Sequence, residues 1–122
     1  MITALHHVQL AMPEAGEVQA RGFYGDLLAI PERQKPAELR SKGGCWFEDS
    51  NVRVHLGVEG DFRPAQKAHP AFQTSDFDKL RKKLENAGVL IQSADAIDQR
   101  ARFFVNDPFG NRIEFINAES EF

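Results

Sequence analysis

The sequence predicts an α+β protein built from two related modules, each with the order strand, helix, strand, strand, strand. Three observations support this prediction. Apolar residues alternate in short segments typical of strands, and recur at three- and four-residue intervals in two segments typical of helices. The order of these segments repeats after roughly 60 residues, as expected for a duplicated unit. The chain has 122 residues, of which 42% are hydrophobic, which is enough for one domain with a single core.

Module one is expected to span residues 1–59. Residues 4–12 alternate as a strand does, and residues 13–30 predict a helix. The helix prediction depends on one apolar stripe at helical spacing, formed by Ala20, Phe23, Tyr24, Leu27 and Leu28. Three strands are predicted to follow, over residues 37–42, 44–49 and 52–58, separated by turns at Gly43-Gly44 and Ser50-Asn51.

Module two is expected to span residues 67–122, after a linker over residues 60–66. It repeats the order of module one, with a strand over 67–74, a helix over 75–88 and strands over 89–92, 100–105 and 112–117. Ser75 and Asp78 are placed as a capping box at the start of the helix, and Gly88 as its C-terminal cap. Residues 107–111 predict a turn between the last two strands. We therefore expect one domain made of two modules.

The composition excludes several classes of protein. Fifteen Lys and Arg residues against 18 Asp and Glu residues give a net charge of −3, so no basic excess is available for nucleic-acid phosphates. Cys45 is the only cysteine, which excludes an internal disulfide and favours a reducing, cytoplasmic location. The first residues do not resemble a signal segment, and no apolar run is long enough to span a bilayer. We expect a cytoplasmic protein that binds neither nucleic acid nor membranes.

All four histidines are predicted to lie in strands, and three of them fall at related places in the two modules. His7 lies in the first strand of module one, and His69 lies 62 residues later in the first strand of module two. His55 lies in the last strand of module one, where module two has Glu114. A pseudo-two-fold relation between the modules would bring these four side chains together.

Alternation along the strands predicts that the candidates share a polar face. His55 is flanked by Val54 and Leu56, and Glu114 by Ile113 and Phe115. His69 has apolar neighbours as well, whereas His7 has Val8 on one side and His6 on the other. The apolar faces would pack under the helices, while the polar faces line a cavity.

A divalent metal ion would compensate the cost of burying these imidazoles and a carboxylate. Their donor atoms suit Zn²⁺, Fe²⁺, Mn²⁺, Ni²⁺ or Co²⁺. His7, His69 and Glu114 alone would form a two-His-one-carboxylate set, with His55 as a fourth ligand or as a base. Two alternatives stay open, namely local hydrogen bonding of strand histidines beside a solvated Glu114, and a closed structural zinc site.

Four stretches of the sequence carry a family resemblance, at residues 5–10, 23–31, 68–72 and, most specifically, 107–115. In these stretches the chain resembles the vicinal oxygen chelate superfamily, the group of glyoxalases, bleomycin-resistance proteins and extradiol dioxygenases. The resemblance implies two βαβββ modules that form a curved, half-open mixed sheet around a central cavity, with helices on the outer face. It also implies a homodimer, and one divalent metal ion held at the positions of His7, His55, His69 and Glu114.

The resemblance further implies the chemistry of the site. Family members chelate two neighbouring oxygens of a small molecule, and the ion stabilises an oxyanion as a Lewis acid. We therefore expect a metal-dependent lyase, isomerase or dioxygenase that acts on a small oxygenated, anionic metabolite. Because His55 stands where glyoxalase I carries an acidic or amide side chain, Glu114 or His55 would act as the base. Two alternatives are a metal-free drug- or metabolite-binding protein of the bleomycin-resistance type and a fosfomycin-type thiol transferase.

Five further residues are candidates for substrate binding. Arg63, Lys67 and Arg102 could bind a carboxylate or phosphate, although Arg63 and Lys67 are equally typical of a solvated linker. Trp46 and Phe104 could stack on an aromatic ligand or belong to the core.

Overall fold

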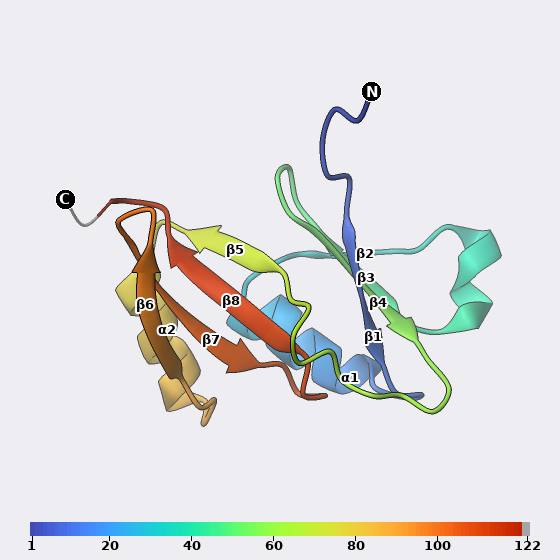
Figure 1. The fold of residues 1–122 in the computed structure, drawn as a ribbon. Helices are drawn as coiled ribbons and strands as arrows, with labels where there is room; N and C mark the ends of the chain where they lie inside the picture. The colour runs from blue at the N-terminus through green and yellow to red at the C-terminus, as the bar shows by residue number, and fades with distance from the viewer. Residues whose placement is uncertain (121–122) are drawn as a thin grey trace. The chain divides into compact units, whose positions relative to one another are not determined.

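The computed structural model describes residues 1–120 and divides the chain into two compact units, Met1–Pro64 and Ala65–Phe122. The first unit contains a four-stranded mixed sheet with the strand order β1–β4–β3–β2 (Figure 1). Strand β1 runs parallel to β4, and the other neighbours are antiparallel. Its elements are β1 (Val8–Met12), α1 (Glu17–Ala20), η1 (Arg21–Leu27), β2 (Glu32–Arg33), η2 (Ala37–Lys42), β3 (Cys45–Glu48) and β4 (Arg53–Val58).

The second unit repeats this arrangement. Its four-stranded mixed sheet has the order β5–β8–β7–β6, with β5 parallel to β8. Its elements are β5 (Ala71–Thr74), α2 (Phe77–Asn86), β6 (Gln92–Ile97), β7 (Arg100–Asn106) and β8 (Arg112–Asn117). The predicted α+β class and the duplicated βαβββ module are confirmed, and neither sheet closes into a barrel.

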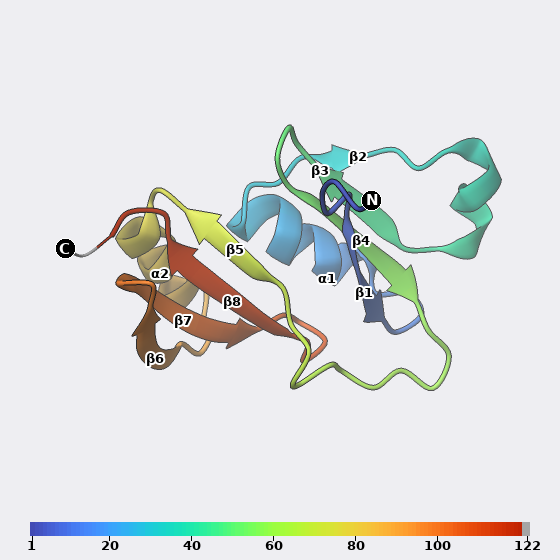
Figure 2. The ribbon, with the colours of Figure 1, turned by 45° about the horizontal axis from the view of Figure 1, so that its top comes forward.

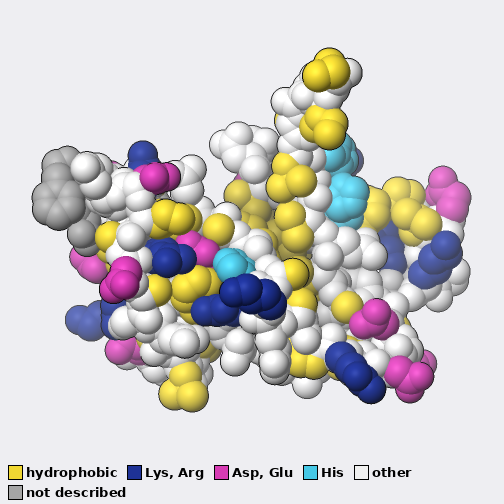
Figure 3. All heavy atoms as spheres, in the orientation of Figure 1, with side chains coloured by type: hydrophobic (Ala, Val, Ile, Leu, Met, Phe, Trp, Pro, Cys, Tyr) yellow, Lys and Arg dark blue, Asp and Glu magenta, His cyan; other side chains and the backbone are white. Residues whose placement is uncertain are grey.

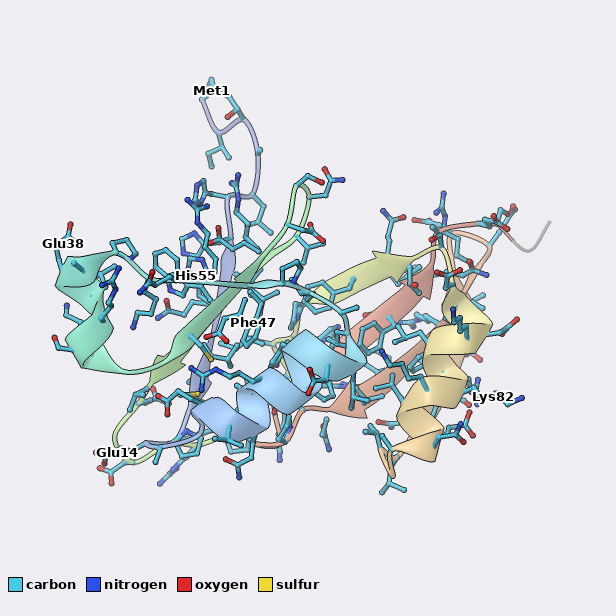
Figure 4. All side chains as sticks on the ribbon, turned by 180° about the vertical axis from the view of Figure 1, so that it is seen from behind. Met1, Glu14, Glu38, Phe47, His55 and Lys82 are labelled. Atoms are coloured by element: carbon cyan, nitrogen blue, oxygen red, sulfur yellow. The ribbon has the colours of Figure 1, made fainter. Side chains whose placement is uncertain are left out.

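In the first unit, the helical segment covers the apolar face of the sheet. The register places Phe47, Val54 and Leu56 on that face, and the ring of Tyr24 lies 5.7 Å from the ring of Phe47. Phe47 is labelled where the sheet faces the helix in Figure 4. Cys45 shares this face and is buried, which raises the pKa of its thiol to about 11. It is therefore part of the core and not a reactive thiolate.

In the second unit, α2 packs on the apolar face of the sheet (Figure 2). The ring of Phe77 on α2 lies 5.2 Å from that of Phe103 on β7, which in turn contacts Phe115 on β8. Phe103 and Phe115 are paired in the sheet, and both side chains point toward α2. The polar face of each sheet is thus the one opposite its helix.

Several predicted elements of the first unit differ from the structure. Residues 37–42 form the 3₁₀ helix η2 and not a strand, because Pro36 precedes them and its carbonyl accepts the Leu39 N–H. The two-residue strand β2 takes the predicted strand's place. The predicted helix winds as a π-helix over Arg21–Leu27, with the N–H of Leu28 bonded to the carbonyl of Phe23. This wider winding changes the angular spacing, so Leu27 is only half-buried.

In the second unit the predicted strands are largely confirmed, with shifted ends. Strand β5 begins at Ala71 and not at residue 67, since Pro70 has no N–H to contribute to the ladder. The strand predicted over 89–92 begins at Gln92 and runs to Ile97. No capping box forms, because α2 begins at Phe77 with Asp76, and not Ser75, at the N-cap, and Asp76 makes no side-chain capping bond. Gly88 has φ +84° and ends α2 as predicted.

The predicted turn over residues 107–111 is built around a buried carboxylate. Asp107 Oδ1 accepts the backbone N–H groups of Phe109 and Asn111, both at 2.9 Å. The Asn111 side chain donates to Asp107 Oδ2 and accepts the N–H of Ala65. This turn therefore fixes the start of β8 against the segment that leads to His69. No helix within residues 1–120 is long and apolar enough to cross a bilayer.

Candidate functional site

The register places the candidate residues at equivalent positions in the two sheets. His55 pairs with Gln9, and Glu114 pairs with Ala71. His7 and His69 each precede those paired residues by two positions and lie before β1 and β5, so only His55 is in a strand. The prediction that all four histidines lie in strands is therefore wrong, because the pairing of β1 with β4 begins at Val8 and that of β5 with β8 begins at Ala71.

His69 and Glu114 are in direct contact in the second unit. His69 Nε2 lies 2.9 Å from Glu114 Oε1, with 25% and 5% of the two side chains exposed. The carbonyl of Pro70 accepts the Glu114 N–H, which keeps the segment before β5 beside β8. Figure 3 shows a histidine side chain over this unit with basic and acidic side chains around it.

The contact made by His69 Nδ1 determines which ring nitrogen carries the proton in the neutral imidazole. Its Nδ1 lies 2.8 Å from the carbonyl oxygen of Lys67, which can only accept a hydrogen bond. Nδ1 must therefore carry a proton, and in the neutral ring Nε2 presents a lone pair to Glu114. A lone pair facing a carboxylate oxygen repels it, so a proton carried by either group, or a metal ion, must lie between the two atoms.

Arg102 and Phe104 line the same face as Glu114. Arg102 Nη1 lies 3.4 Å from Glu114 Oε2, and its Nε donates to the carbonyl of Asp95. Phe104 pairs with Glu114 in the ladder, and its ring lies edge-on to that of His69 with centroids 5.2 Å apart. Arg102 and Phe104 thus lie on the face opposite Phe103.

In the first unit, three rings form a stack. The imidazole of His55 lies 4.0 Å from the ring of Trp46 at an interplanar angle of 5°, and 4.3 Å from the ring of His7 at 20°. Figure 4 labels His55 on its sheet. Trp46 pairs with His55 in the register just as Phe104 pairs with Glu114. Both units therefore place an aromatic ring beside the candidate residue of their last strand.

His55 has a carboxylate partner that the sequence interpretation missed. Its Nε2 lies 2.5 Å from Glu48 Oε2, and Arg33 Nη1 lies 2.9 Å from Glu48 Oε1. Burial tends to raise the pKa of Glu48, but the hydrogen bonds from His55 and Arg33 outweigh it and lower this pKa. The signal was present, because alternation along β3 puts Trp46 and Glu48 on one face.

The predicted site residues are thus gathered in two groups, one in each unit. The first contains His7, Trp46 and His55, and the second contains His69, Arg102, Phe104 and Glu114. Within residues 1–120, no three His, Cys, Asp or Glu side chains are arranged to hold a metal ion. Arg63 and Lys67 are exposed, and Lys67 contributes its backbone carbonyl to His69.

A comparison with protein families decides the classification. Residues 4–115 match the model of the glyoxalase/bleomycin resistance protein/dioxygenase superfamily. The chain belongs to this superfamily. The resemblance predicted from the four sequence stretches is therefore confirmed over nearly the whole chain. No curated protein matches the sequence.

Solved structures of the superfamily share the fold. A protein of Bacillus anthracis assigned to the glyoxalase family is 43% identical, with 98% of each chain covered and a TM-score of 0.92. The fosfomycin resistance protein FosX of Listeria monocytogenes is 15% identical over 95% of this chain and 91% of that one, with a TM-score of 0.76. FosX was also solved with Mn(II) and sulfate; that chain is 14% identical, with 98% and 93% covered and a TM-score of 0.76. At this identity, the likeness to FosX shows the fold alone.

Acidification is expected to destabilise the first unit of this superfamily member through His55. Burial lowers the pKa of His55 below its ordinary 6.5, an effect reinforced by His7 and opposed by the hydrogen bond to Glu48. The unfolded chain therefore takes up a proton at His55 before the folded chain does, so stability falls as the pH drops below 6.5. The lowered pKa of Glu48 adds a loss in the same direction below 4.5. Urea unfolding at pH 7 and pH 5 would show this loss.

The variant His55→Gln provides the comparison for this pH effect. It keeps a hydrogen bond to Glu48 and removes the titrating ring, so its stability should depend less on pH over the same interval. An equally steep loss in the variant would show that other groups cause it.

Proposed function

We propose that this protein is a metal-dependent enzyme that acts on a small oxygenated, anionic metabolite. His69 and Glu114 would bind one divalent ion, and His7, from the same chain or a second copy, would be the third ligand. The observation that supports this most strongly is the orientation of His69. Its Nδ1 bond to Lys67 leaves the Nε2 lone pair directed at Glu114, as in histidines whose second nitrogen is held by a carbonyl beside a metal.

The donor set of the pair fits such an ion. His69 Nε2 and Glu114 Oε1 lie 2.9 Å apart, so both atoms could contact one ion. Imidazole nitrogen and carboxylate oxygen suit zinc, iron, manganese, nickel or cobalt.

A bound ion would supply Lewis-acid stabilisation of an oxyanion. Residues of the chain would bind the substrate, limit access of water and supply the base. Arg102 would hold part of the anionic substrate, and Trp46 and Phe104 would limit access of water to the polar faces. His55 remains the fourth ligand or the base, and Glu114 the other candidate for the base. Because His55 Nε2 faces Glu48, Nδ1 is the ring nitrogen left for either role.

Two other functions remain predictions, together with the homodimer and the cytoplasmic location. A metal-free binding protein of the bleomycin-resistance type would use the same polar faces without an ion. A fosfomycin-type thiol transferase would use the same ligands, and the fold shared with FosX is consistent with it. Arg63 and Lys67 remain substrate-binding candidates.

Metal analysis of protein purified without chelator tests the proposal. We expect one ion per chain in the wild type, none in His69→Ala, and an unchanged content in His6→Ala, which alters a histidine outside the ligand set. His55→Ala decides between ligand and base, because a ligand's loss lowers the metal content. A wild type without metal would reject the enzyme in favour of metal-free binding, and a His69→Ala variant that retains the ion would reject the proposed ligand set.

A further inference from the structure

Two guanidinium groups lie on one buried aromatic ring in the second unit. The Cζ atom of Arg112 is 3.8 Å from the centroid of Phe104, and that of Arg102 is 5.4 Å from it. Phe104 is only 6% exposed. The ladder places Phe104 opposite Glu114, so both cations lie on the polar face that also carries His69 and Glu114.

The charges on this face do not cancel. Glu114 is the one carboxylate that contacts either arginine among residues 1–120, and it pairs with Arg102 at 3.4 Å. Arg112 lies over the Phe104 ring and makes no ion pair within the described part of the chain. By contrast, Arg81, which lies over Phe103 on the helix side, pairs with Glu85. An excess of one positive charge therefore remains beside Phe104.

We propose that Arg112 and Arg102 form an oxyanion-binding subsite over Phe104. A guanidinium stacked on a ring keeps its N–H groups at its edge, where they can bind two oxygens of one carboxylate, phosphate or phosphonate. The ring also holds the side chain in place before a ligand arrives, which lowers the entropy lost on binding. Arg112 would provide most of the contacts to the anion and Arg102 the remainder, because Glu114 neutralises part of the charge of Arg102.

The location of the subsite restricts the ligand. Arg112 and Glu114 are two positions apart on β8, which places them about 7 Å apart along the strand. The ligand of this subsite is thus a small acid. Its anionic group lies a few bonds from the ligand atoms that would contact His69 and Glu114. The claim that the bound anion belongs to a substrate rests on the proposed function. Anion binding at the subsite does not depend on that function.

Titration of chelator-treated protein with simple anions tests the subsite without any metal. The probes are inorganic phosphate, methylphosphonate and acetate, added at constant ionic strength and followed by calorimetry and by amide shifts of β7 and β8. Arg112→Ala should weaken binding about tenfold to a hundredfold, as expected for lost charge-assisted hydrogen bonds. Arg112→Lys, which keeps the charge and loses the planar fork, should also bind more weakly than the wild type.

Arg53→Ala is the matched control. Arg53 pairs with Glu48 in the first sheet as Arg112 pairs with Asn106 in the second, so it has the same strand position in the other unit. Its anion affinity should equal that of the wild type. The subsite is refuted if no probe binds, or if a correctly folded Arg112→Ala variant binds them like the wild type. Anion binding in a protein that takes up no metal would reject the metal-dependent enzyme and keep the subsite.

Discussion

The substitution Gly44→Ala should prevent the first unit from folding. A Cβ atom at this position would lie 2.1 Å from the carbonyl oxygen of Leu56, and φ is +84°. Leu56 is held in the ladder opposite Cys45, so its carbonyl cannot move away without separating β3 from β4. A clash with backbone in a left-handed conformation should cost about 4 kcal/mol or more. Urea unfolding and far-UV circular dichroism would measure the loss.

Gly22→Ala is the matched control for this substitution. Gly22 lies in the helical segment, and an added Cβ meets nothing within 4 Å. Alanine is the better helix former by about 1 kcal/mol, so this variant should be as stable as the wild type or more stable. Because Trp46 lies on β3 and His55 on β4, the Gly44→Ala variant, in which the clash drives these strands apart, should also lose their stack. Wild-type stability in Gly44→Ala would show that the turn adapts, contrary to the observed geometry.

The secondary structure was predicted correctly where it depends on residues that are neighbours in the sequence. Gly43-Gly44 was expected as a turn and both glycines have positive φ, while residues 112–117 form β8 as predicted. The predictions were wrong where contacts with distant segments determine the secondary structure. Strand β1 begins at Val8, where its pairing with β4 begins, and β4 is a distant segment of the chain. The π-winding of Arg21–Leu27 likewise has no periodic signal of its own.

The sequence predicted which residues of the two modules occupy equivalent positions in the candidate site, but not what those residues contact. The equivalence of His7 with His69 and of His55 with Glu114 follows from spacing and alternation, and the register bears it out. The partners of these residues do not follow from spacing. Glu48 is recognised only when β3 is aligned beside β4, and the position of Arg112 over Phe104 requires side-chain coordinates.

The two repeated units have diverged at this shared position. The first carries an imidazole, His55, whose charge is opposed by burial and whose partner Glu48 is held by Arg33. The second carries a carboxylate, Glu114, that meets His69 and Arg102 directly. The same position therefore carries an imidazole in one unit and a carboxylate in the other, and each has different partners.

Substitution of Glu114 should remove the stabilisation that metal ions give to the protein. An ion that binds only the folded chain adds about 4 kcal/mol when present at a thousand times its dissociation constant. In a domain of this size, that raises the melting temperature by about 10 °C or more. Glu114→Gln keeps the shape of the side chain and removes the negative charge, so zinc, manganese or cobalt should no longer shift the transition. Differential scanning calorimetry with and without each ion measures the effect.

Glu59→Gln separates this effect from nonspecific binding of ions to carboxylates. Glu59 is exposed and its backbone N–H bonds to Met12, so its side chain is far less constrained than that of Glu114. This variant should retain the full metal-induced shift. Without metal, Glu114→Gln places Arg102 beside a neutral amide, and the loss of this ion pair should lower its melting temperature. An equal metal shift in Glu114→Gln and the wild type would place the ion elsewhere, because a buried carboxylate that ligates it cannot be replaced by an amide without loss of affinity.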